Sequence, residues 1–145
     1  MLFDRDGTLV VDVPYCADPA LVTPVSTAPA ALALLRAAGI PVGVVSNQSG
    51  IARGLLDREQ VDAVNRRVDD LLGPFDVWQV CPHGPDDGCA CRKPQPGGRY
   101  AAGRGEARSL RGRSAGRQSE VVARPSDCDP CHLQIVTRCS SRDGE

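Results

Sequence analysis

The stretch FDRDGTLV, residues 3–10, decides the fold that we predict for this chain. Asp4 and Asp6 follow a short apolar run, which is typical of the end of a buried β-strand. Gly7 lets the chain turn sharply after them, because glycine adopts positive φ angles without a steric penalty. In an open α/β sheet, ligands bind at the edge where the strands end. The stretch therefore predicts a polar site at the carboxyl edge of a parallel sheet.

Two carboxylates in this position suit the chemistry of phosphate esters. One aspartate can attack phosphorus and form an aspartyl-phosphate, and a second can protonate the leaving oxygen. Mg²⁺ is held in proteins by one or two carboxylates together with phosphate oxygens, and it would offset the repulsion between an aspartate and a phosphate dianion. For the two aspartates alone, an Asp-Gly surface turn is the simpler alternative.

At these residues the chain resembles the haloacid-dehalogenase-like (HAD) phosphatases. The resemblance implies that Asp4 is the nucleophile, that Asp6 is the general acid and base, and that Mg²⁺ is held by Asp4 and the backbone carbonyl of Asp6. It also implies a substrate-pocket wall made of Asp12, Val13, Pro14 and Tyr15. A proline-rich surface loop is the alternative for residues 11–25, and we expect Cys16 to be a small apolar residue there.

A second polar motif follows one α/β unit later. Residues 27–38 are predicted to form a helix capped by Ser26 or Thr27 and ended by Gly39. Residues 40–45 then form a β-branched strand that runs into Ser46-Asn47-Gln48-Ser49. Hydroxyl and amide groups at a strand end can donate hydrogen bonds to phosphate oxygens. The motif resembles the second HAD motif, which implies that residues 46–49 bind substrate and that Ser46 contacts the transferred phosphoryl group.

The next predicted elements complete the parallel sheet. Asp57 and Gln60 have the spacing of a capping box, which opens a helix that runs to about Leu72. Residues 75–80 are then predicted to be a third strand, in which Trp78 belongs to the core or a pocket wall.

Three cysteines and one histidine lie within eleven residues after this strand. Cys81, His83, Cys89 and Cys91 supply the thiolate and imidazole ligands that tetrahedral Zn²⁺ prefers. All four positions would be filled, so the zinc would be structural. Unrelated free thiols are the alternative interpretation.

The zinc motif narrows the resemblance to the heptose-bisphosphate and histidinol-phosphate phosphatase group. In that group an Arg-Lys-Pro segment follows the zinc loop, as Arg92, Lys93 and Pro94 do here. The resemblance implies that Lys93 neutralises the aspartyl-phosphate and the bound phosphate, while Arg92 recognises substrate phosphate. It covers residues 1–97.

The remainder of the chain has a different character. Residues 98–145 are rich in arginine and glycine and are predicted to be poorly ordered, and residues 97–120 show neither helical nor strand periodicity. The acidic motif that would complete the Mg²⁺ site of the family is not found in this sequence. A truncated or frame-shifted, non-catalytic remnant is therefore one alternative. Nonspecific nucleic-acid binding by the basic tail is another.

The Cys-x-x-Cys-His pattern at residues 128–132 resembles a haem attachment site but lacks an export signal beside it. Only three residues precede Asp4, which is short for a buried strand, and a start site further upstream is one explanation.

Together these features predict one α/β domain with a Rossmann-like HAD fold, a zinc loop and no large cap domain. The 145 residues carry a net charge of −1, which points to no particular partner. We expect a monomeric, cytoplasmic phosphatase that acts on a small sugar phosphate and neither spans a membrane nor depends on nucleic acid. The substrate that the resemblance favours is D-glycero-D-manno-heptose 1,7-bisphosphate, with removal of the 7-phosphate, and histidinol phosphate is the alternative.

Overall fold

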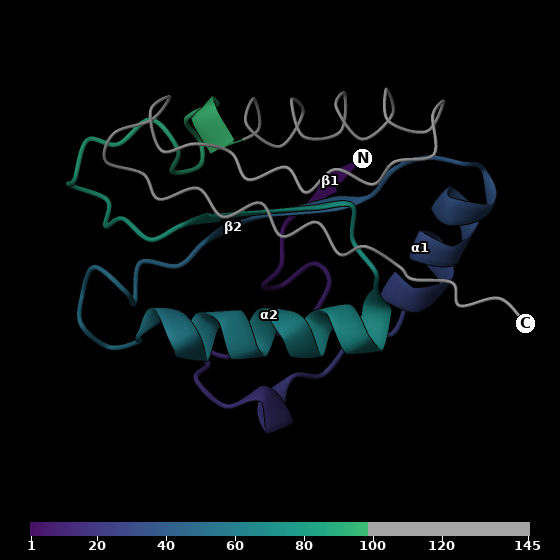
Figure 1. The fold of residues 1–145 in the computed structure, drawn as a ribbon, viewed down its shortest axis with the longest axis horizontal. Helices are drawn as coiled ribbons and strands as arrows, with labels where there is room; N and C mark the ends of the chain where they lie inside the picture. The colour runs from purple at the N-terminus through teal and green to yellow at the C-terminus, as the bar shows by residue number, and fades with distance from the viewer. Residues whose placement is uncertain (99–145) are drawn as a thin grey trace, which may run out of the picture.

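The computed structural model describes residues 1–98 of the chain. The predictions for residues 99–145, including the disorder of the tail, lie outside the described residues. Within residues 1–98, strands and helices alternate along the chain in the order expected of a parallel α/β fold (Figure 1). None of the helices in this part of the chain has the length and apolar character needed to cross a membrane.

The sheet consists of three parallel strands in the order β1-β2-β3. Their bounds are β1 Leu2–Phe3, β2 Gly43–Asn47 and β3 Val77–Cys81. Phe3 pairs with Val44, and Asn47 pairs with Cys81. This register confirms the predicted parallel sheet. It also brings the polar residues that follow each strand to one edge.

Helix α1, Ala28–Ala37, lies between β1 and β2 in the sequence. Its N-cap is Thr27, but the Thr27 side chain makes no capping hydrogen bond. The expectation of a side-chain cap at Ser26 or Thr27 is thus wrong, because Thr27 itself has helical dihedrals, whereas a capping side chain requires an extended backbone. Gly39 follows the helix as predicted, and the amide of Ile40 donates to the carbonyl of Leu35.

Helix α2, Arg58–Leu72, begins with the predicted capping box. The Gln60 amide donates to Asp57 Oδ1 at 2.7 Å, and the Gln60 side chain accepts from the Asp57 amide at 2.9 Å. These two bonds satisfy backbone donors that a helix start otherwise leaves without partners.

Both helices pack on the same face of the sheet and form the main core. Val44 and Trp78 contribute from the sheet, Leu32 from α1, and Val64 and Val68 from α2. In Figure 1, α2 runs along this face of the sheet. Trp78 is 5 % exposed, which confirms that it belongs to the core. Cys16 is buried in the same cluster, as its predicted apolar role requires.

Two strands begin later in the structure than their sequence predicted. Strand β2 begins at Gly43 rather than at Ile40, because the Ile40 amide donates to the Leu35 carbonyl at the end of α1. The Ile40 side chain is exposed. Phe75 does not join β3, because its amide donates to Asp69 Oδ1 and its ring packs edge-on against Trp78. Local capping and ring packing therefore displace the strand starts by two or three residues.

The segment between β1 and α1 folds back over the core rather than extending into solvent. It contains the short 3-10 helix Pro19–Leu21. The Val11 amide donates to the Thr23 carbonyl, and the Val25 amide donates to the Leu9 carbonyl. These bonds close a loop around residues 12–15 and hold it beside the carboxyl edge of the sheet.

The capping box predicts a measurable contribution to stability. Asp57→Ala removes the side-chain acceptor of the Gln60 amide and should lower the free energy of unfolding by about 1 kcal/mol in urea titrations. Arg66→Ala, at an exposed position of the same helix, is the matched control and should change it by less than about 0.5 kcal/mol. Equal effects of the two substitutions would contradict a specific role for the cap.

Candidate active site

Asp4 and Asp6 lie directly beyond the end of β1. The turn after them is closed by hydrogen bonds from the Gly7 amide to the Val10 carbonyl and from the Leu9 amide to the Arg5 carbonyl. Gly7 has a φ of 70°, which is the conformation that favours glycine. Leu9 and Val10 are buried, so the turn is anchored in the core. The structure thus places both carboxylates at the predicted edge of the sheet.

Lys93 is brought against Asp4 from the far end of the described chain. Its Nζ lies 2.5 Å from Asp4 Oδ1 and donates to the Val45 carbonyl at 2.9 Å. The Asn47 side-chain amide makes two hydrogen bonds to the Lys93 backbone: Oδ1 accepts from the Lys93 amide at 3.0 Å, and Nδ2 donates to the Lys93 carbonyl at 3.2 Å. Lys93 therefore stands where it can neutralise negative charge on Asp4.

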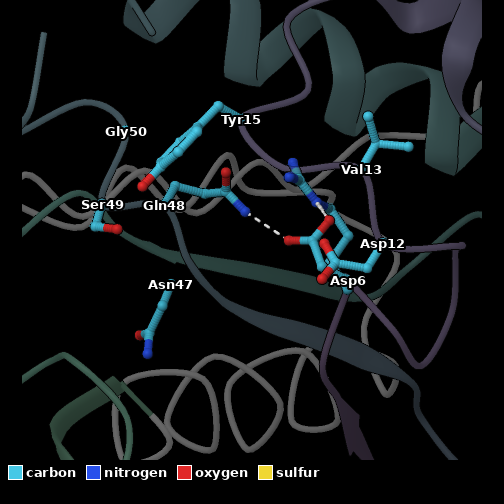
Figure 2. Close-up of a pocket in the computed structure, with 9 residues that line it drawn as sticks. Asp6, Asp12, Val13, Tyr15, Asn47, Gln48, Ser49 and Gly50 are labelled. Carbon is cyan, nitrogen blue, oxygen red and sulfur yellow. Dashed lines mark hydrogen bonds and ion pairs between the residues drawn. The ribbon is translucent and has the colours of Figure 1, made fainter. Parts of the chain in front are cut away.

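The carboxylate of Asp6 is fixed by two donors. Arg5 Nε donates to its Oδ1 at 2.9 Å, and Gln48 Nε2 donates to its Oδ2 at 2.8 Å. Figure 2 shows the Gln48 amide pointing at Asp6. Gln48 Nε2 also donates to Ser46 Oγ at 2.8 Å. Two donors on a carboxylate fix its orientation, as a proton-transfer group requires.

Arg5 is a component of the site that sequence reasoning missed. Its side chain is 2 % exposed, and it links Asp6 to Asn65 of α2, whose Oδ1 accepts from Arg5 Nη1 at 2.8 Å. A buried guanidinium needs such acceptors, because burying a charge without partners is costly. The signal in the sequence was Asn65, a polar residue on the apolar stripe formed by Val61, Val64 and Val68.

A pocket of about 180 Å³ opens beside Asp6 (Figure 2). Residues from the loop after β1 and from the motif after β2 line it: Arg5, Asp6, Asp12, Val13, Tyr15, Asn47, Gln48, Ser49 and Gly50. Most of the predicted substrate-binding residues therefore converge on one cavity. Pro14, Ser46, Arg92 and Lys93 are not part of its lining. Ser46 is fully buried beneath Gln48.

The four predicted zinc ligands form one tight cluster. The ligand atoms of Cys81, His83, Cys89 and Cys91 all lie within 4.8 Å of one another. Cys81 Sγ is 3.7 Å from Cys89 Sγ and 3.7 Å from His83 Nδ1, while Cys91 Sγ is 3.5 Å from His83 Nδ1. A tetrahedral zinc with ordinary bond lengths separates its ligand atoms by roughly 3.5–3.8 Å. The donor set and its spacing thus fit Zn²⁺.

The pKa values of two of these thiols are shifted in opposite directions. Burial raises the pKa of the Cys81 thiol. The pKa of the Cys89 thiol is lowered: burial opposes the thiolate, but the backbone amide of Arg92 and the thiols of Cys81 and Cys91 stabilise it by hydrogen bonds. Metal binding takes thiolates rather than thiols, so Cys89 is deprotonated at less cost than Cys81.

The cysteine cluster is joined by hydrogen bonds to the elements that form the pocket. The backbone amide of Gln48 donates to the Cys81 carbonyl at 2.7 Å, and the backbone amide of Ala52 donates to the Pro82 carbonyl at 3.2 Å. Arg92 Nη1 donates to the His83 carbonyl at 3.0 Å. Arg92 thus bonds to the backbone of the cysteine cluster, and its recognition of substrate phosphate stays a prediction.

Comparison with known proteins assigns the family. No family model matches the chain. The chain is 35 % identical over 101 residues to a probable D-glycero-D-manno-heptose-1,7-bisphosphate 7-phosphatase from Thermoplasma volcanium, covering 67 % of this chain and 69 % of that protein. The chain belongs to this family of HAD-like phosphatases.

Further relatives agree with this assignment. The D-glycero-beta-D-manno-heptose-1,7-bisphosphate 7-phosphatase of Pseudomonas aeruginosa is 41 % identical over 106 residues, which is 67 % of this chain and 57 % of that enzyme. The D,D-heptose 1,7-bisphosphate phosphatase of B. bronchiseptica, solved with magnesium and phosphate, superposes with a TM-score of 0.66 at 36 % identity. That match covers 74 % of this chain and 63 % of the solved one. The chain spans about half of the length of the first two curated relatives that it matches. The HAD-like fold expected from the sequence is confirmed.

The buried contact between Arg5 and Asn65 predicts a coupling of α2 to this HAD site. Asn65→Ala leaves a guanidinium N–H buried without its acceptor and should lower the free energy of unfolding by about 1–3 kcal/mol in urea titrations. Arg66→Ala, the exposed neighbour on α2, should have little effect. A loss at Asn65 no larger than that at Arg66 would contradict the account of Arg5 as a buried charge that needs both acceptors.

Proposed function

We propose that this chain is a Mg²⁺-dependent phosphatase that forms an aspartyl-phosphate on Asp4. The observation that carries the proposal is the ion pair between Lys93 and Asp4 at 2.5 Å, beside an Asp6 carboxylate held by two donors. A nucleophilic carboxylate, a fixed cation and a fixed proton-transfer group are the parts that hydrolysis of a phosphate ester through an aspartyl-phosphate requires.

The proposed reaction has two steps. An oxygen of Asp4 attacks phosphorus, the bond from phosphorus to the sugar oxygen breaks, and Asp6 gives its proton to that oxygen. Water then attacks phosphorus and its proton passes to Asp6. The bond from phosphorus to the Asp4 oxygen breaks, so that inorganic phosphate leaves and the Asp4 carboxylate is restored. Lys93 offsets the negative charge on Asp4 and on the phosphoryl group throughout.

Asp4 and the backbone carbonyl of Asp6 would hold Mg²⁺. Carboxylate and carbonyl oxygens are the ligands that this ion prefers, and Asp4 is half-exposed at the edge of the sheet. When bound, the ion supplies positive charge that lets an anionic nucleophile approach a phosphate dianion. Gln48 and Arg5 keep Asp6 oriented for its proton transfers.

The names of the relatives support the substrate that we propose. Those proteins are named heptose-1,7-bisphosphate 7-phosphatases. The pocket is small, at about 180 Å³, and polar, which suits a sugar phosphate. We therefore propose D-glycero-D-manno-heptose 1,7-bisphosphate as substrate, with hydrolysis of the 7-phosphate.

We further propose a structural Zn²⁺ in the cysteine cluster. Cys91 is two residues from Lys93, and Arg92 between them donates a hydrogen bond to the His83 carbonyl. A metal that fixes this loop would therefore also fix the direction from which Lys93 approaches Asp4. A loop with so little apolar surface takes much of its order from its metal.

Phosphate release tests the proposed activity. The purified chain should release phosphate from heptose 1,7-bisphosphate only when Mg²⁺ is present, and Asp4→Asn should reduce the rate to background. Asp70→Asn, an exposed carboxylate on α2, is the control and should leave the rate unchanged. Faster release from histidinol phosphate would reassign the substrate. Activity retained by Asp4→Asn would refute the nucleophile.

Metal content tests the zinc proposal. Elemental analysis after gel filtration should find about one zinc per chain. Cys89→Ser should lose that zinc and melt at a lower temperature, because metal binding contributes directly to folding. Cys16→Ser is the matched control, since Cys16 is buried outside the cluster, and should keep its zinc. Equal zinc contents in the two variants would contradict the site.

A further inference from the structure

Tyr15 has an unusual backbone conformation at the pocket. Its φ is 51°, the left-handed region that residues other than glycine seldom adopt. Such strain is retained only where the surroundings enforce it, and it gathers at functional sites. The Tyr15 ring also packs closely on Gly50, where an added Cβ would lie 2.9 Å from Tyr15 Cδ1. The structure thus accepts strain and a close approach to place this ring in the pocket lining.

Arg53 is attached to that ring from outside the pocket. Its Nη1 donates to the Tyr15 hydroxyl at 2.9 Å, and its Cζ lies 6.0 Å from the ring centroid. The turn that carries Arg53 is fixed by bonds from its own amide to the Ser49 carbonyl and from the Gly54 amide to the Ile51 carbonyl. Arg53 is exposed, and a guanidinium has five N–H donors. Donors therefore remain to bind an anion.

The charges along the pocket are unevenly distributed. In Figure 2, Asp6 and Asp12 lie at one end of the lining, the Tyr15 hydroxyl and Ser49 lie at the other, and Gln48 lies between them. An anionic group at the second end would be distant from these carboxylates.

Other nearby cations already have partners. Arg5 is paired with Asp6, and Lys93 is paired with Asp4. Arg92 donates to the His83 carbonyl. Arg53 contacts the Tyr15 hydroxyl directly, so among residues 1–98 it is the cation that an anion beside Tyr15 would meet.

We propose that Arg53 and Tyr15 form a recognition site for the second phosphate of a bisphosphate substrate, the one that is not transferred. The inference rests on the proposed function. A substrate whose reacting phosphate lies at Asp4 and Asp6 extends along the pocket, and its far end reaches the Tyr15 end. A guanidinium binds phosphate through two parallel N–H bonds. The site selects bisphosphates over monophosphates of similar size, which gain nothing from Arg53.

Binding measurements separate this site from the catalytic one. Dissociation constants are measured by calorimetry with Mg²⁺, using the full chain carrying Asp4→Asn so that the ligand is not consumed. The two probes are heptose 1,7-bisphosphate and heptose 7-phosphate. Adding Arg53→Gln should weaken binding of the bisphosphate about tenfold, the effect of losing a charge-assisted hydrogen bond. Binding of the 7-phosphate should not change.

Two further variants complete the experiment. Tyr15→Phe removes the hydroxyl that holds Arg53 and should weaken binding of the bisphosphate by a smaller factor. Arg67→Gln removes the same charge from an exposed position on α2 and should change neither constant. The inference is overturned if Arg53→Gln leaves binding of the bisphosphate unchanged, or if it weakens both ligands equally. Failure of the 7-phosphate to bind any form of the chain would instead count against the proposed function, and the inference would fall with it.

Discussion

The ion pair between Lys93 and Asp4 is the contact on which the rest of this site depends. Asp4 follows the first strand, whereas Lys93 follows the third, so the pair forms only when the sheet is assembled in its parallel order. An exposed lysine alone would rarely hold one position, because its long side chain loses rotamer freedom. Here the Val45 carbonyl holds the ammonium group, and the Asn47 amide holds the backbone. Asn47, the last residue of β2, therefore helps to position the cation that faces Asp4.

A second connection runs from the core to the site through α2. The apolar stripe of this helix packs on the sheet, and Asn65 interrupts it to accept a hydrogen bond from Arg5. Arg5 in turn orients Asp6. Packing of the helix, burial of the guanidinium and orientation of the carboxylate are thus one continuous arrangement. A change in the packing of α2 is expected to reach the Asp6 carboxylate.

Much of this arrangement could be predicted from local sequence. The strand-to-turn pattern at Asp4 and Asp6, the capping box at Asp57 and the spacing of the cysteine cluster each encode their structure within a few residues. What the sequence did not reveal depends on contacts between distant residues. Arg5 looked like an ordinary charge between two aspartates, because its partner Asn65 is sixty residues away. Nothing in the sequence around Arg53 indicates its contact with Tyr15, because the two residues are 38 positions apart. The predicted strand starts were also too early. The Ile40 amide bonds to the end of α1, and Phe75 bonds to Asp69 and packs on Trp78 instead of joining β3.

The most direct test of the central claim asks whether Asp4 can carry a phosphoryl group in this chain. Beryllofluoride forms an adduct with such aspartates that mimics the aspartyl-phosphate, and fluorine NMR detects it without any need for turnover. The account predicts bound fluorine signals that require Mg²⁺ and that disappear in Asp4→Asn. Folded chain that gives no bound signal with Mg²⁺, or a signal that survives Asp4→Asn, would contradict it.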